Sequence, residues 1–384
     1  MEKFIGFKNS NIYVEGKGVI KTSAFVEDGK IKSFEEKEGQ LELDEKYIVI
    51  PGFIDRHIHG ANGSDAMYPN LEDIRNICKT VASEGVSSFL PTTMTQTKEN
   101  ICAALNNIKE YIEKENDKGA YVLGVHLEGP FISPKYKGAQ LEKCIIPCDV
   151  EKFKEFEKAS GDNIKQVSLA YEENGKELSN YLESKNIVAS LGHTNATAVE
   201  VVEAAKNGVT SATHTYNAMK GLHHREAGTV GGVLISDEIY AELICDLIHV
   251  SKEAIKVLFK AKGLDKVTLV TDGIEAKHLP DGTYKLGGQD VYVKGREARL
   301  IDGTLAGSTL KMNEAVRNIK SVLNLSTEKA VDLATINPAK VLKIDDKKGS
   351  IALGKDADFA VIDADFNVYM TVANGLVVYN NLKK

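Results

Sequence analysis

The 384-residue chain has 48 basic and 55 acidic residues, a formal net charge of -7, and a hydrophobic content of 42%. Its basic residues are interspersed with acidic ones, which argues against nucleic-acid binding, and no apolar run approaches the ~20 residues of a membrane span. The N-terminus lacks the apolar core of a signal peptide. We therefore expect a soluble, cytoplasmic protein with no nucleic-acid or membrane partner, and the five scattered cysteines are expected to be unpaired thiols.

Both ends of the chain predict β structure. Residues 1–50 contain short apolar runs separated by glycines and by the turn signal Asp28-Gly29. Residues 345–384 show the same pattern of short apolar runs separated by turn signals, one of which is Asn374-Gly375. Two β-rich ends around a different middle predict a small β-sandwich domain formed by residues 1–50 and 345–384.

The middle of the chain, residues 51–344, alternates apolar runs of strand length with helical patterns. The strand candidates are 48–54, 86–90, 121–128, 164–170, 187–193, 209–214, 240–246 and 266–272. Helical stretches lie between most of them, at 71–84, 101–118, 150–159, 177–185, 198–207 and 252–261. This alternation predicts an α/β fold with a (β/α)8 TIM-type barrel, and a doubly wound open sheet is the structural alternative. Residues 274–307 interrupt this alternation of strands and helices, which indicates a hairpin insertion beside the candidate functional site.

The stretch Pro51–Gly60, PGFIDRHIHG, contains the first candidate ligands. His57 and His59 are two residues apart, and alternate side chains of a strand point to the same face. Both imidazoles can therefore approach one point, and imidazole is the commonest side-chain metal ligand. The alternative is a pair of ordinary surface histidines at a strand end.

Further polar residues stand at the C-terminal ends of four other apolar runs: Glu128, His193, His214 and Asp272. The C-terminal face of a parallel barrel carries the active site. The alternative is that these strands simply end in polar residues, but that would predict Lys, Ser and Asn at the same positions as well. Two imidazoles and one carboxylate are a ligand set of catalytic zinc sites. A metal lowers the pKa of the water bound to it from ~16 towards ~7, so that hydroxide is available at neutral pH. Asp272 could then move a proton from water to a leaving amine, although a turn or helix N-cap role is the alternative.

Several segments resemble a known family. Pro51–Gly60 is similar to the opening motif of the amidohydrolase superfamily, and the tail from Asn337 to Asp358 is similar to its closing segment. More narrowly, the chain resembles the N-acetylglucosamine-6-phosphate deacetylase family, through residues 126–131, 191–194, 213–219, 271–273 and 305–308. The resemblance covers nearly the whole chain.

This resemblance implies hydrolysis of the acetamide of N-acetylglucosamine 6-phosphate, giving glucosamine 6-phosphate and acetate. It implies Glu128, His193 and His214 as metal ligands, and Asp272 as the acid–base residue. One or two divalent metals per subunit are expected, and imidazole with carboxylate suits zinc, iron, cobalt and manganese. Some family members lack the second histidine of the first motif and use one metal. This chain has both His57 and His59, so a second metal position is expected, with Glu128 as the bridging candidate.

The resemblance also implies substrate contacts, at Ala139, Asn217, Ala218, Arg225, His249, Leu305, Ala306, Gly307 and Ser308. In relatives the arginine at the Arg225 position reaches the site of a neighbouring subunit, so a homodimer is implied. A permanent guanidinium cation suits a phosphate. Without the resemblance, however, the sequence around Arg225 predicts an exposed charged loop. His126 shares a strand face with Glu128, and we expect it to support the ligands rather than bind metal.

The sequence leaves two alternatives open. The chain could be another amidohydrolase, dihydroorotase-like or aminoacylase-like, but Arg225 and the pair Asn217-Ala218 would supply phosphate and sugar contacts that argue against this. It could also be a scaffold that has kept the barrel without the activity. Such proteins usually lose ligands, and none of the expected ligands is missing here.

Overall fold

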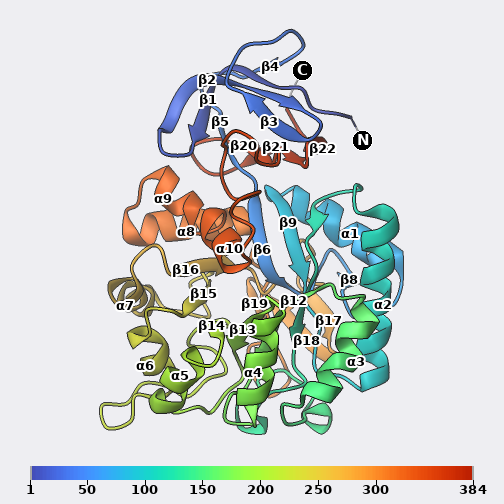
Figure 1. Cartoon of the computed structure of the whole chain (residues 1–384), viewed down its shortest axis with the longest axis vertical. Coiled ribbons are helices and arrows are strands. Elements are labelled where there is room, and N and C mark those ends of the chain that lie inside the picture. Colours follow the sequence, from blue (N-terminus) through green and yellow to red (C-terminus); the bar gives the residue numbers. More distant parts are fainter. Residues whose placement is uncertain (1, 383–384) are drawn as a thin grey trace.

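The chain folds into two parts, which the computed structural model describes for residues 2–382. Figure 1 shows a barrel of strands surrounded by helices, with a β-rich part at one end where both termini lie. Within residues 2–382, no helix is both long and apolar enough to cross a membrane. All five cysteines are free, as predicted.

Parallel strands form the inner wall of the larger part. They are β6 (Phe53–Ile58), β9 (Val86–Pro91), β10 (Tyr121–Val122), β11 (Val125–Glu128), β12 (Ile164–Leu169), β13 (Val188–Leu191), β14 (Val209–Ala212), β15 (Tyr240–Ile244) and β16 (Val267–Val270). The order is β10-β9-β6 in one sheet and β11 to β16 in sequence in another. Parallel bridges from Thr92 to His126 and from Ile58 to Gly273 join the two sheets at both seams. The wall is therefore closed, so the predicted TIM-type barrel is confirmed and the open sheet is excluded.

Helices cover the outside of this wall. They are α1 (Leu71–Ala82), α2 (Lys98–Glu115), α3 (Val150–Ser160), α4 (Gly175–Ser184), α5 (Ala198–Ala205), α6 (Gly228–Ile235), α7 (Lys252–Lys262), α8 (Met312–Leu323), α9 (Thr327–Asp332) and α10 (Ile336–Val341), with short 3-10 turns η1 (Pro134–Tyr136) and η2 (Glu142–Cys144). The six predicted helices are present, with their ends shifted by a few residues. Polar N-caps begin several of them, and Thr197 with Glu200 forms a capping box at α5.

Helix α6 was missed by the sequence reasoning. Its sequence, GTVGGVLI, contains three glycines and has no polar face, so no helical periodicity is visible. Gly232 allows close packing on α5, because a Cβ added there would lie 2.5 Å from Cβ of Val201. This contact explains a helix built from poor helix formers.

Strands from both chain ends form one further sheet. They are β1 (Gly6–Val14), β2 (Gly18–Glu27), β3 (Lys30–Ser33), β4 (Leu41–Glu42), β5 (Ile48–Pro51), β20 (Phe359–Ile362), β21 (Val368–Ala373) and β22 (Leu376–Asn380). The order is β22-β21-β20-β5-β1-β2-β3, with β4 on β1. The antiparallel pair β5–β20 joins the two ends of the chain. A separate apolar cluster, which includes Phe4, Phe7 and Phe359, packs within this part.

The first strand candidate, residues 48–54, was wrong as a single barrel strand. Residues Ile48–Pro51 pair with β20 of the terminal sheet, and the barrel strand begins at Phe53. Gly52 stands between them, and its amide donates to the carbonyl of Asp358 at 3.1 Å. A Cβ at Gly52 would lie 2.4 Å from Cβ of Ser87, so the two sheets approach closely at this crossing.

The insertion after β16 contains more than the predicted hairpin. It forms a three-stranded antiparallel sheet of β17 (Gly282–Leu286), β18 (Gln289–Lys294) and β19 (Glu297–Arg299). Its apolar face packs with Met94 and Ile274 in a small cluster of its own. A two-stranded ribbon, β7 (Gly60–Ala61) with β8 (Ser64–Asp65), follows the first barrel strand.

We predict that Gly52→Ala lowers the free energy of unfolding by about 1–3 kcal/mol, because the new methyl overpacks the crossing against Ser87. Gly221→Ala is the control, since a Cβ there meets nothing within 4 Å. Denaturant unfolding of both variants measures the difference. Equal midpoints for the two variants would contradict the close approach.

Candidate metal centre

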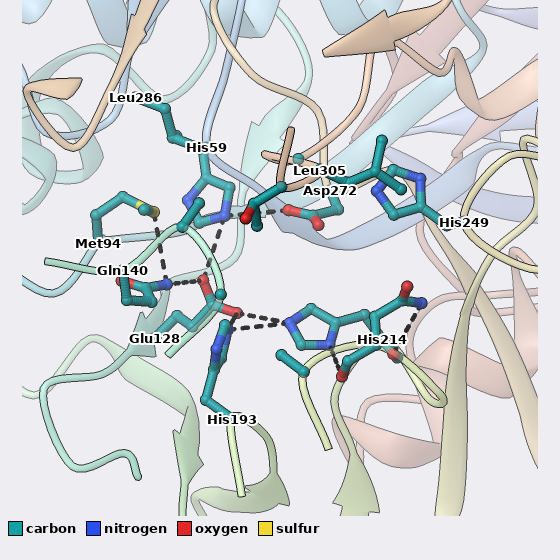
Figure 2. Close-up of a pocket in the computed structure, with 16 residues that line it drawn as sticks. His59, Met94, Glu128, Gln140, His193, His214, His249, Asp272, Leu286 and Leu305 are labelled. Carbon is teal, nitrogen blue, oxygen red and sulfur yellow. Dashed lines mark hydrogen bonds and ion pairs between the residues drawn. The ribbon is translucent and has the colours of Figure 1, made fainter. Parts of the chain in front are cut away.

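A cavity of about 200 Å³ lies where the barrel strands end (Figure 2). The residues that line it are His59, Met94, Glu128, Gly138, Ala139, Gln140, His193, His214, Asn217, Ala218, His249, Asp272, Leu286, Thr304, Leu305 and Gly307. They come from the C-terminal ends of several strands and from the loops that follow them, together with the insertion sheet. This is the end of a parallel barrel at which active sites are built.

Sharp turns after the strands aim the polar side chains into the cavity. Glu128 is the last residue of β11, whereas His193, His214 and Asp272 each lie two residues beyond a strand. These last three have positive φ angles of 48°, 30° and 50°. Non-glycine residues in this region cost on the order of 1–3 kcal/mol each. Hydrogen bonds hold the turn at Asp272, whose amide donates to the carbonyl of His57 at 2.9 Å.

Glu128 is shared by two groups of potential ligands. Its Oε1 lies 3.3 Å from Nε2 of His193 and 3.2 Å from Nε2 of His214. The same Oε1 lies 3.4 Å from Nε2 of His57, and Oε2 lies 3.3 Å from Nε2 of His59. In each of the sets His57–His59–Glu128 and Glu128–His193–His214, the ligand atoms lie within 4.8 Å of one another. Figure 2 shows Glu128 between His59 and the pair His193 and His214.

All four histidine rings are oriented by a contact at Nδ1. The partners are Glu242 Oε2 for His57 at 3.1 Å, the Thr92 carbonyl for His59 at 3.2 Å, the Tyr136 carbonyl for His193 at 3.0 Å, and the Asn217 carbonyl for His214 at 3.2 Å. Carbonyl and carboxylate oxygens only accept hydrogen bonds, so each Nδ1 carries the proton and donates it. Each Nε2 is left to face Glu128, which is the arrangement of metal-binding histidines.

These residues fit a divalent metal. Within the described part of the chain, Nε2 of His57 and Oε1 of Glu128 are buried and have no hydrogen-bond partner. The Nε2 atoms of His193 and His214 face each other at 3.2 Å. Unpaired buried polar atoms are costly, and a cation shared by these donors would satisfy them. Imidazole and carboxylate donors suit zinc, iron, cobalt or manganese.

The electrostatics of the site favour a cation. Burial raises the pKa of Glu128, but the neighbouring imidazoles of His57, His193 and His214 outweigh it and hold this pKa well below the usual range. Burial lowers the pKa of His59, but contacts with Asp272 and Glu128 raise it to about 9. Burial likewise opposes ionisation of Glu242, yet the Arg56 guanidinium and His57 keep its pKa far below normal. The carboxylates therefore stay charged and attract positive charge.

Asp272 lies at the edge of this ligand group. Its Oδ1 is 3.1 Å from Nε2 of His59 and 3.4 Å from Nε2 of His57. The turn that carries it is tied to the first barrel strand, because Thr271 donates its hydroxyl to Oδ2 of Asp55 at 2.5 Å. Burial raises the pKa of this Asp55 carboxyl to about 6. The structure thus brings Asp272 beside the set His57–His59–Glu128.

Six of the predicted substrate residues line the cavity: Ala139, Asn217, Ala218, His249, Leu305 and Gly307. Three others do not. Ala306 is buried in the cluster under the insertion sheet, and Ser308 is buried with its hydroxyl donating to the Thr271 carbonyl at 2.5 Å. Arg225 is exposed, in the loop before α6. The substrate roles of all nine stay predictions.

Sequence reasoning missed several residues of the site. Gln140 donates from Nε2 to Oε2 of Glu128 at 2.8 Å, whereas the sequence indicates only its neighbour Ala139. Met94 and Leu286 line the cavity, but nothing in their sequence context indicated it. Glu242 and Arg56 lie buried below the ligands, and a charged residue inside an apolar strand was the available signal. His126 contacts Ser168 at 2.7 Å and belongs to neither ligand set.

Comparisons with known proteins agree with this geometry. Residues 48–378 match the model of the amidohydrolase family, and the chain belongs to that family. An N-acetylglucosamine-6-phosphate deacetylase of Bacillus subtilis (strain 168) is 43% identical over 363 residues, covering 92% of each chain. An N-acetylgalactosamine-6-phosphate deacetylase of Escherichia coli O157:H7 is 33% identical, covering 89% of this chain and 91% of the relative.

Solved structures extend the likeness to three dimensions. The crystal structure of N-acetylglucosamine-6-phosphate deacetylase from Thermotoga maritima matches with a TM-score of 0.89 and 37% identity. The match covers 98% of this chain and 99% of that chain. The predicted resemblance to the N-acetylglucosamine-6-phosphate deacetylase family is therefore confirmed.

We predict that the double variant His57→Asn, His59→Asn binds less metal than the wild type but keeps the position formed by Glu128, His193 and His214, because that set is complete without them. Elemental analysis of purified protein gives the metal content per chain. The double variant His223→Asn, His224→Asn is the control, since this exposed pair of rings lies outside the cavity. Full wild-type metal content in the first variant would show that the pair does not bind metal.

Proposed function

We propose that the chain hydrolyses the acetamide of N-acetylglucosamine 6-phosphate to glucosamine 6-phosphate and acetate, in amino-sugar catabolism or recycling. The observation that carries this proposal is the buried Glu128, shared by four histidines beside Asp272 at the mouth of the barrel. Relatives that bear the name of this deacetylase support the substrate. We propose one or two divalent metals per chain, with the set Glu128, His193 and His214 as the tighter position.

The reaction needs one group that both accepts and donates a proton. A divalent metal, when bound by these ligands, supplies a Lewis acid that polarises the acetamide carbonyl and acidifies water. Asp272 accepts the proton of the attacking water while the new C–O bond forms at the acetyl carbon. It then donates that proton to the nitrogen as the C–N bond breaks, which releases a neutral amine and acetic acid. The acid then loses its proton to the amine or to water, which leaves acetate. Its place beside His57 and His59 supports this role.

The remaining cavity residues would bind the sugar phosphate. His249 is held by Asp246, whose carboxylate lies 2.7 Å from Nδ1, and it faces the cavity. Asn217 and Ala218 supply an amide side chain and backbone groups at the same wall. Arg225 is exposed and does not line the cavity of its own chain. This supports a homodimer in which Arg225 reaches the phosphate bound by the partner subunit.

We also propose a full (β/α)8 barrel at residues 51–344 and a small β-sandwich domain at 1–50 and 345–384. The helices α1 to α8 follow successive barrel strands along the chain, which supports the eightfold alternation. The terminal sheet has an apolar cluster separate from that of the barrel, which supports a distinct domain. A cytoplasmic location stays a prediction.

We predict that Asp272→Asn lowers kcat at least about a hundredfold, because the amide keeps the shape but cannot accept the proton. Metal content and the unfolding midpoint should stay near wild type. Asp237→Asn, at an exposed position after α6, is the control and should keep wild-type kcat. A near-normal kcat for Asp272→Asn would refute the acid–base role, whereas loss of metal would make Asp272 a ligand.

We predict that Arg225→Ala lowers kcat/KM for the phosphorylated sugar by about 10–100-fold, through loss of a charge-assisted contact worth roughly 1.5–3 kcal/mol. Unphosphorylated N-acetylglucosamine should be little affected. Acetate release from both sugars measures this, with Arg317→Ala on the exposed side of α8 as the control. Equal losses on the two sugars would remove Arg225 from the phosphate site.

A further inference from the structure

A buried ion pair lies below the ligand group, inside the barrel. Glu242, in the middle of β15, has 0% of its surface exposed, and so does Arg56 of β6. Oε1 of Glu242 lies 3.1 Å from a terminal nitrogen of Arg56 and accepts from Nε2 of Gln166 at 2.8 Å. Oε2 of Glu242 faces away from Arg56 and contacts the ligand residues. The two carboxylate oxygens thus contact different groups.

The lower side of this network holds Arg56 in place. Its guanidinium donates to the side-chain oxygens of Gln166 at 2.5 Å, Ser211 at 2.9 Å and Thr268 at 3.0 Å. Buried ion pairs contribute little net stability, because the cost of removing two charges from water offsets their attraction. Stability alone therefore does not explain charged residues at the centre of an apolar barrel.

The upper side connects both ligand sets. Oε2 of Glu242 accepts from Nδ1 of His57 at 3.1 Å and from the backbone amide of His214 at 3.1 Å. His57 belongs to one set and His214 to the other, and both sets share Glu128. One carboxylate oxygen therefore fixes a member of each set.

Two local features make this contact possible. The register of β6 against β9 shifts between Asp55 and Ile58, so the strict alternation of the strand is broken there. As a result the sequence neighbours Arg56 and His57 both reach Glu242. The left-handed backbone at His214, with φ of 30°, turns its amide toward the same oxygen.

We propose that Glu242 is a positioning residue that couples the two metal positions, and that Arg56 fixes its orientation. The rings of His59, His193 and His214 are held by backbone carbonyls, which side-chain substitution leaves in place. The ring of His57 alone among the four depends on a side-chain carboxylate. Removing this carboxylate should loosen His57 most. The inference rests on the metal sites proposed above but not on the identity of the substrate.

The test is Glu242→Gln in the full chain, stripped of metal and titrated with Co²⁺. Glutamine cannot replace both oxygens, because its amide nitrogen would face donors either at Arg56 and Gln166 or at His57 and His214. Substitutions of residues that orient metal-binding histidines typically weaken metal affinity by about 10–100-fold. We expect a loss of this size at the His57–His59 position, measured by equilibrium dialysis, with a changed visible spectrum of bound Co²⁺.

The matched control is Glu84→Gln, another buried carboxylate, paired with the buried Lys277 at 2.8 Å. It should lower thermal stability but leave Co²⁺ affinity and spectrum unchanged. If Glu84→Gln weakens Co²⁺ binding as much as Glu242→Gln, the effect is one of stability and the positioning role is refuted.

Glu242→Asp carries the test if Glu242→Gln does not fold. It keeps the charge but shortens the reach, so the same position should lose affinity to a smaller extent. Wild-type affinity in a folded variant overturns the proposal, as does failure of both variants to fold, which would assign Glu242 a structural role. A wild-type chain that binds no Co²⁺ would instead overturn the metal sites themselves.

Discussion

The burial of Glu128 is the constraint on which the site depends. This carboxylate is only 2% exposed, and the Nε2 atoms of four histidines lie 3.2 to 3.4 Å from its oxygens. Removing an ion from water costs several kcal/mol even after the protein relaxes. The cost is met only when positive charge lies beside the carboxylate. Because every Nδ1 is already committed to an acceptor, that charge must come to the Nε2 side, where a metal would bind.

The barrel supplies the rigidity that this arrangement needs. Parallel strands bring their C-terminal ends together, and the turns after them place His193, His214 and Asp272 in strained left-handed conformations. Such residues persist only where surrounding contacts over-determine them. The hydrogen bond from Thr271 to Asp55 across the seam of the barrel is one such contact. The strain is therefore stored where precise direction matters for chemistry.

The cavity has two kinds of wall. Figure 2 shows Met94 and Leu286 on one side of the ligand group and His249 on the other. The insertion sheet contributes Leu286 and buries an apolar face of its own beneath it. An acetyl group and a sugar phosphate differ in the same way, one apolar and the other rich in oxygen. This division agrees with the proposed substrate and gives the insertion a role in shaping the site.

The sequence by itself determined the barrel and the ligand candidates, because residues at the ends of parallel strands converge whatever the details of packing. The spacing of His57 and His59, and the strand-end positions of Glu128, His193 and His214, were enough for that. Only the tertiary structure decided that the run before Phe53 belongs to another sheet and that Glu242 touches both ligand sets. Those contacts depend on strand register and on the irregularity in β6, and register is set by partners distant in sequence rather than by local pattern.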